Sequence, residues 1–123
     1  MDYRKEYEKW LASPALSEDE RAELKALESN DKEIKARFYG PLEFGTAGLR
    51  GTMYTGLHNM NRHVIRWATQ GFANVIRAEG TEAMQKGIAV CMDCRNHSAE
   101  FARETACVMA ANGIHVRLFE PLR

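Results

Sequence analysis

The feature that most constrains the fold of this 123-residue chain is an alternation of strand and helix patterns that begins after Pro41. Short apolar segments, typical of buried strands, alternate with longer segments whose apolar residues recur at helical spacing. This order is typical of βαβ units, which have right-handed crossovers and a parallel sheet. We therefore predict an α/β fold in which a three-stranded parallel sheet, a βαβαβ core, is flanked by helices. The predicted strands are Leu42–Leu49, Ile88–Met92 and Ile114–Phe119.

The helices of this pattern have recognisable ends. Asn61 precedes the first helix as an N-cap, and Gly80 ends it. Ser98 is the predicted N-cap of the second helix, Glu100 complements the dipole of its first turn, and Asn112-Gly113 closes it. The first helix carries an apolar stripe that we expect to form core: Val64, Ile65, Ala68, Phe72, Val75 and Ile76.

Residues 1–40 are predicted to form a helical extension that precedes an incomplete α/β domain over residues 41–123. Tyr3, Tyr7 and Trp10 recur at helical spacing, and such a stripe is typical of a helix that packs on its own core. A surface for docking a partner is the alternative. The helix signals in this extension are a stop at Ser13-Pro14, a capping box at Ser17–Glu20, a cap at Asn30 and a stop at Gly40-Pro41.

Composition excludes several functional classes. The 17 basic and 17 acidic residues cancel, whereas binding to nucleic acid or to anionic membranes relies on excess positive charge. The apolar runs Ile88–Met92 and Cys107–Ala111 are far shorter than the ~20 residues of a membrane span. No apolar stretch follows Arg4 and Lys5, so no secretory signal is visible. We expect a cytoplasmic protein that binds neither nucleic acid nor membrane.

The chain has 3 cysteines, which we expect to be reduced thiols. Cys91 and Cys94 have the C-x-x-C spacing of a redox motif, but Cys91 lies inside an apolar run and is interpreted as a buried small hydrophobe. A zinc site lacks a second ligand pair, and His58 and His63 miss the helical i, i+4 spacing by one residue. We therefore predict no metal site in this chain.

The run Phe44–Gly51 places an arginine among three evenly spaced glycines. Glycine lets backbone N–H groups approach an anion closely, and the guanidinium fork of Arg50 can hold two phosphate oxygens. Ligands of parallel α/β sheets bind beyond the carboxyl ends of the strands, a place that Arg50 and Arg95 share. The alternatives are a glycine-rich turn with a surface arginine, and a local ion pair between Arg95 and Asp93.

The segment Leu42–Gly51 resembles the opening motif of the α-D-phosphohexomutases, the phosphoglucomutase/phosphomannomutase family. Later segments resemble this family in the same order, so that the resemblance covers essentially the whole chain. The sequence Asn96-His97-Ser98 departs from the family, in which a histidine precedes an asparagine at this point. The resembling segments are Trp10-Leu11, Arg37–Tyr39, Met60-Asn61, Ala68–Gly71, Asp93–Arg95, Ser98, Phe101 and Ala110–Ile114.

This resemblance implies the first part of domain I, a three-layer α/β/α domain, of a phosphosugar mutase. Such enzymes move a phosphoryl group between sugar positions through a phosphoserine and a bisphosphate intermediate, with the help of magnesium. By match to the motif, Arg50 would contact the phosphate of the phosphorylated sugar, Thr46 and Gly48 would shape the loop, and Arg95 would support the site. The family's catalytic serine loop, Thr-Ala-Ser-His-Asn-Pro, and its metal-binding aspartates do not occur before Arg123, so we expect no catalytic residue in this chain and no activity from it alone.

Two further expectations follow. A rival function is a stand-alone, non-catalytic α/β domain that binds a phosphorylated ligand or a protein partner. If instead the chain is part of a longer domain, the strand Ile114–Phe119 should expose apolar surface and an unpaired edge. We then expect self-association of this chain, by edge pairing or by swapping of helices between copies, or else a disordered C-terminus from about Gly113 onward.

Overall fold

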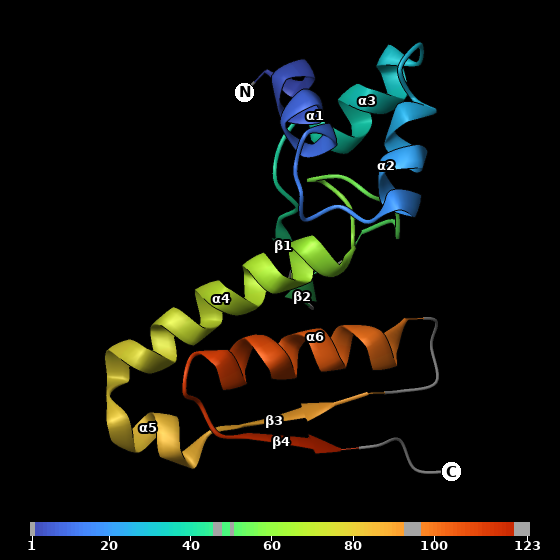
Figure 1. Ribbon diagram of the computed structural model, residues 1–123. Coiled ribbons are helices and arrows are strands. Elements are labelled where there is room, and N and C mark those ends of the chain that lie inside the picture. Colours follow the sequence, from blue (N-terminus) through green and yellow to red (C-terminus); the bar gives the residue numbers. More distant parts are fainter. Residues whose placement is uncertain (1, 46–47, 50, 93–96, 120–123) are drawn as a thin grey trace. The chain divides into compact units, whose positions relative to one another are not determined.

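The computed structural model describes residues 2–45, 48–49, 51–92 and 97–119 (Figure 1). The chain divides into two compact units, Met1–Asn61 and Arg62–Arg123. Each unit has a hydrophobic core of its own. Within the described ranges, no helix has the length and apolar character that crossing a lipid bilayer requires.

The N-terminal unit begins with helices α1 (Tyr3–Leu11), α2 (Glu18–Lys25) and α3 (Asp31–Phe38). Their N-termini are capped by side chains, which satisfy backbone N–H groups that the helix itself leaves unpaired. Ser17 and Glu20 form the reciprocal capping box before α2, and the Asn30 side chain accepts from the Glu33 N–H before α3. These caps confirm the predicted starts of both helices.

The core of this unit forms where the aromatic side chains of α1 meet α3. Tyr7 and Trp10 each lie edge-on to Phe38, with ring centroids 5.7 Å apart. The Tyr7 hydroxyl donates to the backbone oxygen of Leu24 at 2.7 Å, and burial raises the pKa of this hydroxyl. The prediction that the aromatic stripe packs on its own core is therefore confirmed.

The predicted single strand Leu42–Leu49 is wrong. The structure has two short strands there, β1 (Phe44–Gly45) and β2 (Gly48–Leu49), which pair antiparallel with each other. Glycine weakens a strand interior, and Gly45 and Gly48 are direct partners across this ladder. The glycine spacing that was interpreted as a loop after a strand instead belongs to a hairpin.

The C-terminal unit contains α4 (Arg62–Glu79), α5 (Thr81–Lys86), β3 (Ile88–Cys91), α6 (Ser98–Ala111) and β4 (Val116–Phe119). β3 and β4 are parallel, with Ile88 opposite Val116 and Cys91 opposite Phe119. The two later predicted strands and their parallel pairing are thus confirmed, together with an α/β fold. Among the described strands the parallel sheet has these 2 strands, so the predicted third strand is not part of it.

The two long helices of this unit, α4 and α6, lie on the same side of the sheet. Figure 1 shows α6 between α4 and the two strands, and α6 contacts α4, β3 and β4. The core between them holds Ala73 from α4, Met109 from α6 and Ile114, which precedes β4. A second helical layer on the other face of the sheet is not seen among the described residues.

Two predictions of burial fail in this unit, one on β3 and part of one on α4. Val90 is buried, so its neighbour Cys91 points to the opposite, uncovered face and is an exposed free thiol. The buried residues of α4 are Val64, Thr69, Ala73 and Ile76. The predicted stripe is thus confirmed at Val64 and Ile76, whereas its members Phe72 and Val75 are exposed.

The ends of the elements follow the sequence signals with one shift. α4 begins directly after Asn61, and α6 ends at Asn112-Gly113, as predicted. The predicted cap Ser98 is instead the first residue of α6, and the N-cap is His97 in a left-handed conformation with φ 65°. The short helix α5 was not predicted; it has no buried residue, and Ala83 and Met84 lie at the border of the core.

Just before the two parallel strands begin, the backbone segments at Gly87 and His115 are in close contact. Gly87 has φ +74°, and a Cβ placed there would lie 2.0 Å from the backbone oxygen of His115. That oxygen accepts a hydrogen bond from the Ile88 N–H at 2.9 Å. Only glycine fits this position, because its missing side chain makes room for the neighbouring backbone.

Candidate functional site

The sequence-predicted site residues fall largely outside the described ranges. Thr46, Arg50 and Arg95 belong to the segments 46–47, 50 and 93–96, for which the structure gives no description. Gly48 is described as part of β2, where it is the ladder partner of Gly45. What the structure does provide is the framework on either side of the glycine run.

The two ends of the run lie against each other. Leu42 precedes the hairpin and Gly51 follows it, and a Cβ on Gly51 would lie 3.0 Å from Leu42 Cδ1 and 3.5 Å from Met60 Cγ. A side chain at position 51 would therefore require the end of the Leu42 side chain to shift slightly, whereas its contact with Met60 would be an ordinary one. Leu42, Gly51 and Met60 thus lie together at the base of the hairpin.

The segment after Gly51, which we call the 52–60 loop, closes on itself. The Met60 N–H donates to the backbone oxygen of Thr52 at 2.9 Å. Within the loop, the Asn61 side-chain amide donates to the backbone oxygens of Tyr54 at 3.0 Å and Gly56 at 2.8 Å. Asn61 is 9% exposed. A buried amide that pairs with two carbonyls fixes the path of the backbone, since leaving either group unpaired is costly.

Arg37, from the last turn of α3, is the main side chain that holds this loop. Its side chain is 8% exposed, and its Nε donates to Glu33 Oε1 at 2.9 Å. Its Nη1 donates to Glu23 Oε1 at 3.0 Å and to the backbone oxygen of Thr55 at 3.2 Å. The guanidinium carbon also lies 4.6 Å from the ring centroid of Tyr54.

Glu23 completes this cluster from α2. Its carboxylate accepts from both the hydroxyl and the N–H of Thr55. Arg37 is thus paired with two carboxylates, so its positive charge is compensated within the cluster. Sequence reasoning did not single out Glu23, Arg37 or Thr55. The i, i+4 spacing of Glu33 and Arg37 on one helix was the available signal, and it is common on helix surfaces.

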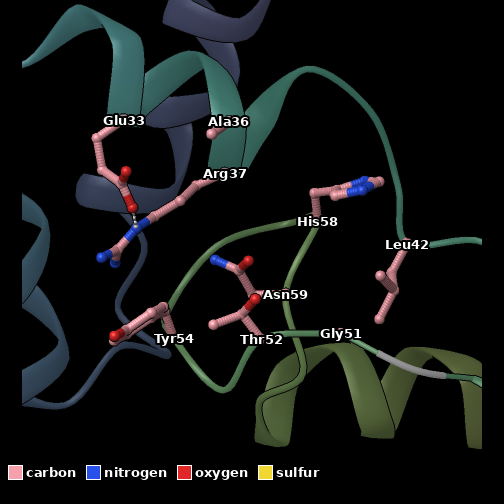
Figure 2. A pocket seen from close by; sticks show the side chains of 9 residues that line it. All are labelled: Glu33, Ala36, Arg37, Leu42, Gly51, Thr52, Tyr54, His58 and Asn59. Carbon is pink, nitrogen blue, oxygen red and sulfur yellow. Dashed lines mark hydrogen bonds and ion pairs between the residues drawn. The ribbon is translucent and has the colours of Figure 1, made fainter.

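A cavity of about 360 Å³ lies between α3 and the 52–60 loop (Figure 2). Figure 2 shows Glu33, Ala36 and Arg37 on the α3 side, facing Tyr54, His58 and Asn59 on the loop side. His58 is engaged at both ring nitrogens, Nδ1 with the Gly40 backbone oxygen at 3.1 Å and Nε2 with the Tyr39 hydroxyl at 2.8 Å. Leu42, Gly51 and Thr52 also line the cavity.

The walls of this cavity carry hydrogen-bonding groups and paired charges, and Gly51, the last residue of the glycine run, is part of its lining. No group of three or more His, Cys, Asp or Glu side chains that could hold a metal ion is found where side chains are described. Chemically, the described part of the site can orient a loop and accept hydrogen bonds. Arg50, which the sequence analysis expects to contact phosphate, directly precedes Gly51, the residue before the 52–60 loop.

In the C-terminal unit, residues that the sequence singled out have structural contacts. Gln70 and Asn112 exchange amide hydrogen bonds at 3.0 and 2.9 Å, and Asn112 is the C-cap of α6. Arg66 and Glu104 form a bidentate ion pair between the same two helices. Asn112 and Gln70 therefore fix how α4 packs on α6. His97 bonds to Glu100 Oε2 at 3.2 Å within the first turn of α6.

Comparison with known proteins places these features in a family. Residues 41–123 match the family model described as phosphoglucomutase/phosphomannomutase, alpha/beta/alpha domain I. A phosphopentomutase of Homo sapiens is 38% identical over 101 residues, which are 77% of this chain and 16% of that protein. A phosphoribomutase of Saccharomyces cerevisiae is 38% identical over 93 residues, 76% of this chain and 15% of that protein.

A phosphomannomutase of Mycoplasma pneumoniae is 30% identical over 115 residues, which are 94% of this chain and 21% of that protein. The chain therefore spans between 15% and 21% of the length of these curated relatives. No solved structure matches it significantly. All three relatives are named as phosphosugar mutases, and their names differ in the sugar: pentose, ribose and mannose.

Proposed function

This chain belongs to the phosphoglucomutase/phosphomannomutase family, and on that basis we propose that it is the N-terminal part of a phosphosugar mutase. The proposal includes a domain I that starts at residue 41, where the family match begins, and a three-layer α/β/α arrangement of the complete domain. Residues 1–40 would be a helical extension before it. A phosphorylated sugar is the proposed substrate, and the cytoplasm is the proposed location.

In the proposed reaction a phosphoserine transfers its phosphoryl group to one sugar hydroxyl. The bisphosphorylated sugar turns around, and its other phosphate returns to the serine. Such chemistry depends on positioning and on electrostatic stabilisation of the phosphoryl oxygens. Arg50 is proposed to hold the phosphate in a bidentate pair, with Thr46 and Gly48 shaping its loop, while Arg95 supports the site. An arginine stays protonated, so neither can act as nucleophile or base.

The serine and the magnesium ligands are proposed to lie outside this chain. The described side chains do not fit a magnesium site, since no cluster of carboxylates forms among them. We derive no step through magnesium from these residues. The chain by itself is proposed to be inactive as a mutase.

The observation that carries this proposal is the family match over residues 41–123, which includes the glycine run and Arg50. The geometry supports it, because the run's two ends converge at Leu42 and Gly51 and the following loop is anchored by hydrogen bonds. A loop that binds phosphate through backbone N–H groups needs such a fixed base. The stand-alone binding domain remains the rival outcome of the experiment below.

The test is Arg50→Lys in the full-length parent protein, with Arg117→Lys as the matched control, since Arg117 is an exposed arginine of β4. Lysine keeps the charge and loses the bidentate fork, worth about 1.5–3 kcal/mol for a hydrogen bond to a charged group. We expect kcat to fall about 10- to 100-fold, more than KM rises, and no turnover by the 123-residue chain alone.

Steady-state kinetics with phosphorylated pentoses and hexoses give both numbers. Wild-type kinetics for Arg50→Lys would contradict the proposal that Arg50 holds the phosphate. A parent protein that binds sugar bisphosphate without turning it over would favour the rival, non-catalytic function.

A further inference from the structure

We propose that Arg37 and Glu23 are positioning residues for the phosphate-binding run, and that the N-terminal helices serve as the platform on which this run is built. The proposal deepens the proposed function, since it assigns to the helical extension a part in the same site. It rests on contacts within the N-terminal unit, all of them between described residues.

The first observation is that Arg37 holds the 52–60 loop with its side chain and its backbone. Its Nη1 donates to the Thr55 backbone oxygen at 3.2 Å, and its own backbone oxygen accepts from the His58 N–H at 2.8 Å. Arg37 lies in the last turn of α3, so these bonds connect the end of a packed helix to the middle of the loop. Displacement of the loop would break both at once.

The second observation is a close approach of backbones at Gly56. This residue has φ +146°, and a Cβ placed there would lie 2.9 Å from Arg37 Cβ and 3.1 Å from the Arg37 backbone oxygen. The loop thus lies directly on Arg37 at the point where it has no side chain. The contact is specific in geometry, because a loop that merely covered α3 would not require glycine here.

The third observation is that Glu23 ties the same loop to α2. Its carboxylate receives the Thr55 hydroxyl and N–H as well as the Arg37 guanidinium. Thr55 is 4% exposed. Charge-assisted hydrogen bonds of this kind are stronger than neutral ones and are geometrically demanding. Two helices therefore converge, through one ion pair, on a single residue of the loop.

The last step connects the loop to the glycine run. The loop begins at Thr52, directly after Gly51, and the bond from the Met60 N–H to the Thr52 oxygen closes it there. Met60 and Leu42 both pack on Gly51. A loop that is fixed at Thr55 and closed at Thr52 fixes Gly51, and Gly51 is the residue that follows Arg50. The described contacts thereby connect the ion pair to Gly51, the last residue of the glycine run.

The test compares Arg37→Met, Arg37→Lys and Glu23→Gln with Arg4→Met, in the 123-residue chain and in the full-length parent. Arg4 belongs to the same unit but forms an exposed ion pair with Asp31, at 2.9 Å, far from the loop in sequence. Methionine at position 37 keeps the bulk of the side chain and leaves Glu23 and Glu33 without their shared cation.

Hydrogen exchange in the 123-residue chain is the readout that does not depend on any mutase activity. We expect amide exchange over residues 52–60 to become at least about tenfold faster in Arg37→Met and in Glu23→Gln, while α1 keeps its protection. Arg37→Lys should restore part of the protection, and Arg4→Met should leave the loop unchanged. Equal exchange in all variants would overturn the proposal, even if the parent is an active mutase.

Kinetics of the parent then separate positioning from general stability. Misplacing a catalytic loop lowers kcat, so Arg37→Met should reduce kcat at least about tenfold with a smaller change in KM, with partial rescue by lysine. If Arg37→Met does not fold, hydrogen exchange and kcat are both measured on Arg37→Lys and Glu23→Gln instead. Faster exchange with unchanged kcat would refute the role in positioning, and an inactive wild type would instead refute the proposed function.

Discussion

In the N-terminal unit Leu24, Ile34 and Phe38 are 0% exposed, whereas in the C-terminal unit Phe72 and Val75 are 54% and 57% exposed. The difference lies in what surrounds the apolar residues. The first unit packs three helices and a loop around one cluster, which holds these three fully buried side chains. The second unit places both long helices on one side of a two-stranded sheet, and no described helix covers the other face of that sheet.

This comparison separates two ways of supporting a functional loop. The described part of the glycine run lies in the first unit, where Arg37 and Glu23 hold the 52–60 loop that follows it. In the second unit, β3 ends before Arg95 in the chain and pairs with β4, whose Leu118 and Phe119 are exposed. Helix α4 of the same unit also exposes large apolar side chains, namely Trp67, Phe72 and Val75.

The largest expected effect tests the difference between the two cores. Phe38→Ala removes a fully buried ring and should lower the free energy of unfolding of the N-terminal unit by about 3–5 kcal/mol. Phe72→Ala is its matched control in the C-terminal unit and should cost well under 1 kcal/mol, because its ring is more than half exposed. Urea unfolding measures both. A comparable cost for the two variants would break the comparison.

The second effect concerns the open sheet. β4 pairs only with β3 among the described strands, and Leu118 and Phe119 are 41% and 52% exposed. An edge of this kind is a template for another chain, so we expect the isolated chain to self-associate as its concentration rises. Light scattering over a dilution series measures this.

The double variant Leu118→Lys and Phe119→Lys should shift that chain toward the monomer, since like charges on an edge oppose pairing. The exposed variant Lys32→Gln of α3 provides the control in the other unit. A chain that stays monomeric at high concentration with a wild-type edge would contradict the expectation.

The smallest effect sharpens the comparison at a single position of α4. A Cβ on Gly71 would meet nothing within 4 Å, so Gly71→Ala should stabilise the isolated chain by about 0.5–1 kcal/mol through lower backbone entropy in the unfolded state. Ala78→Gly, an exposed position of the same helix, should have the opposite sign. Thermal unfolding detects both. Destabilisation by alanine at position 71 would mean that this face of α4 is covered.

How much the sequence could predict differs between local and distant features. Ser17 and Asn30 cap helices through bonds to residues three positions away, so their roles could be predicted from local spacing. Cys91 and Phe72 were assigned to the core, but the face that becomes covered depends on where α6 packs. The hairpin at Gly45 and Gly48 was missed because the same glycines also fit a loop that ends one strand.

The candidate site shows the same limit. Arg50 could be singled out because a cation among glycines has a chemical meaning by itself. The residues that hold the framework could not, because Glu23 and Thr55 are 32 positions apart and meet only after three helices have packed. Arg37 was noted only as part of a resembling segment. Its role depends on contacts with the 52–60 loop, and no pattern within α3 predicts those contacts.

The tight contact at Gly87 has a consequence for how variation is tolerated in this chain. At most positions a substitution is judged by its chemistry, so that an apolar residue replaces another with little harm. At position 87 any side chain is excluded, because the His115 carbonyl occupies the space where every other residue carries its Cβ, and the positive φ also favours glycine. Alanine and tryptophan should therefore destabilise the fold to a similar extent at this position, since both have a Cβ. A mutational profile that is flat and uniformly unfavourable is the expected signature of this backbone contact, and it would mark the register of the parallel strands without any knowledge of their side chains.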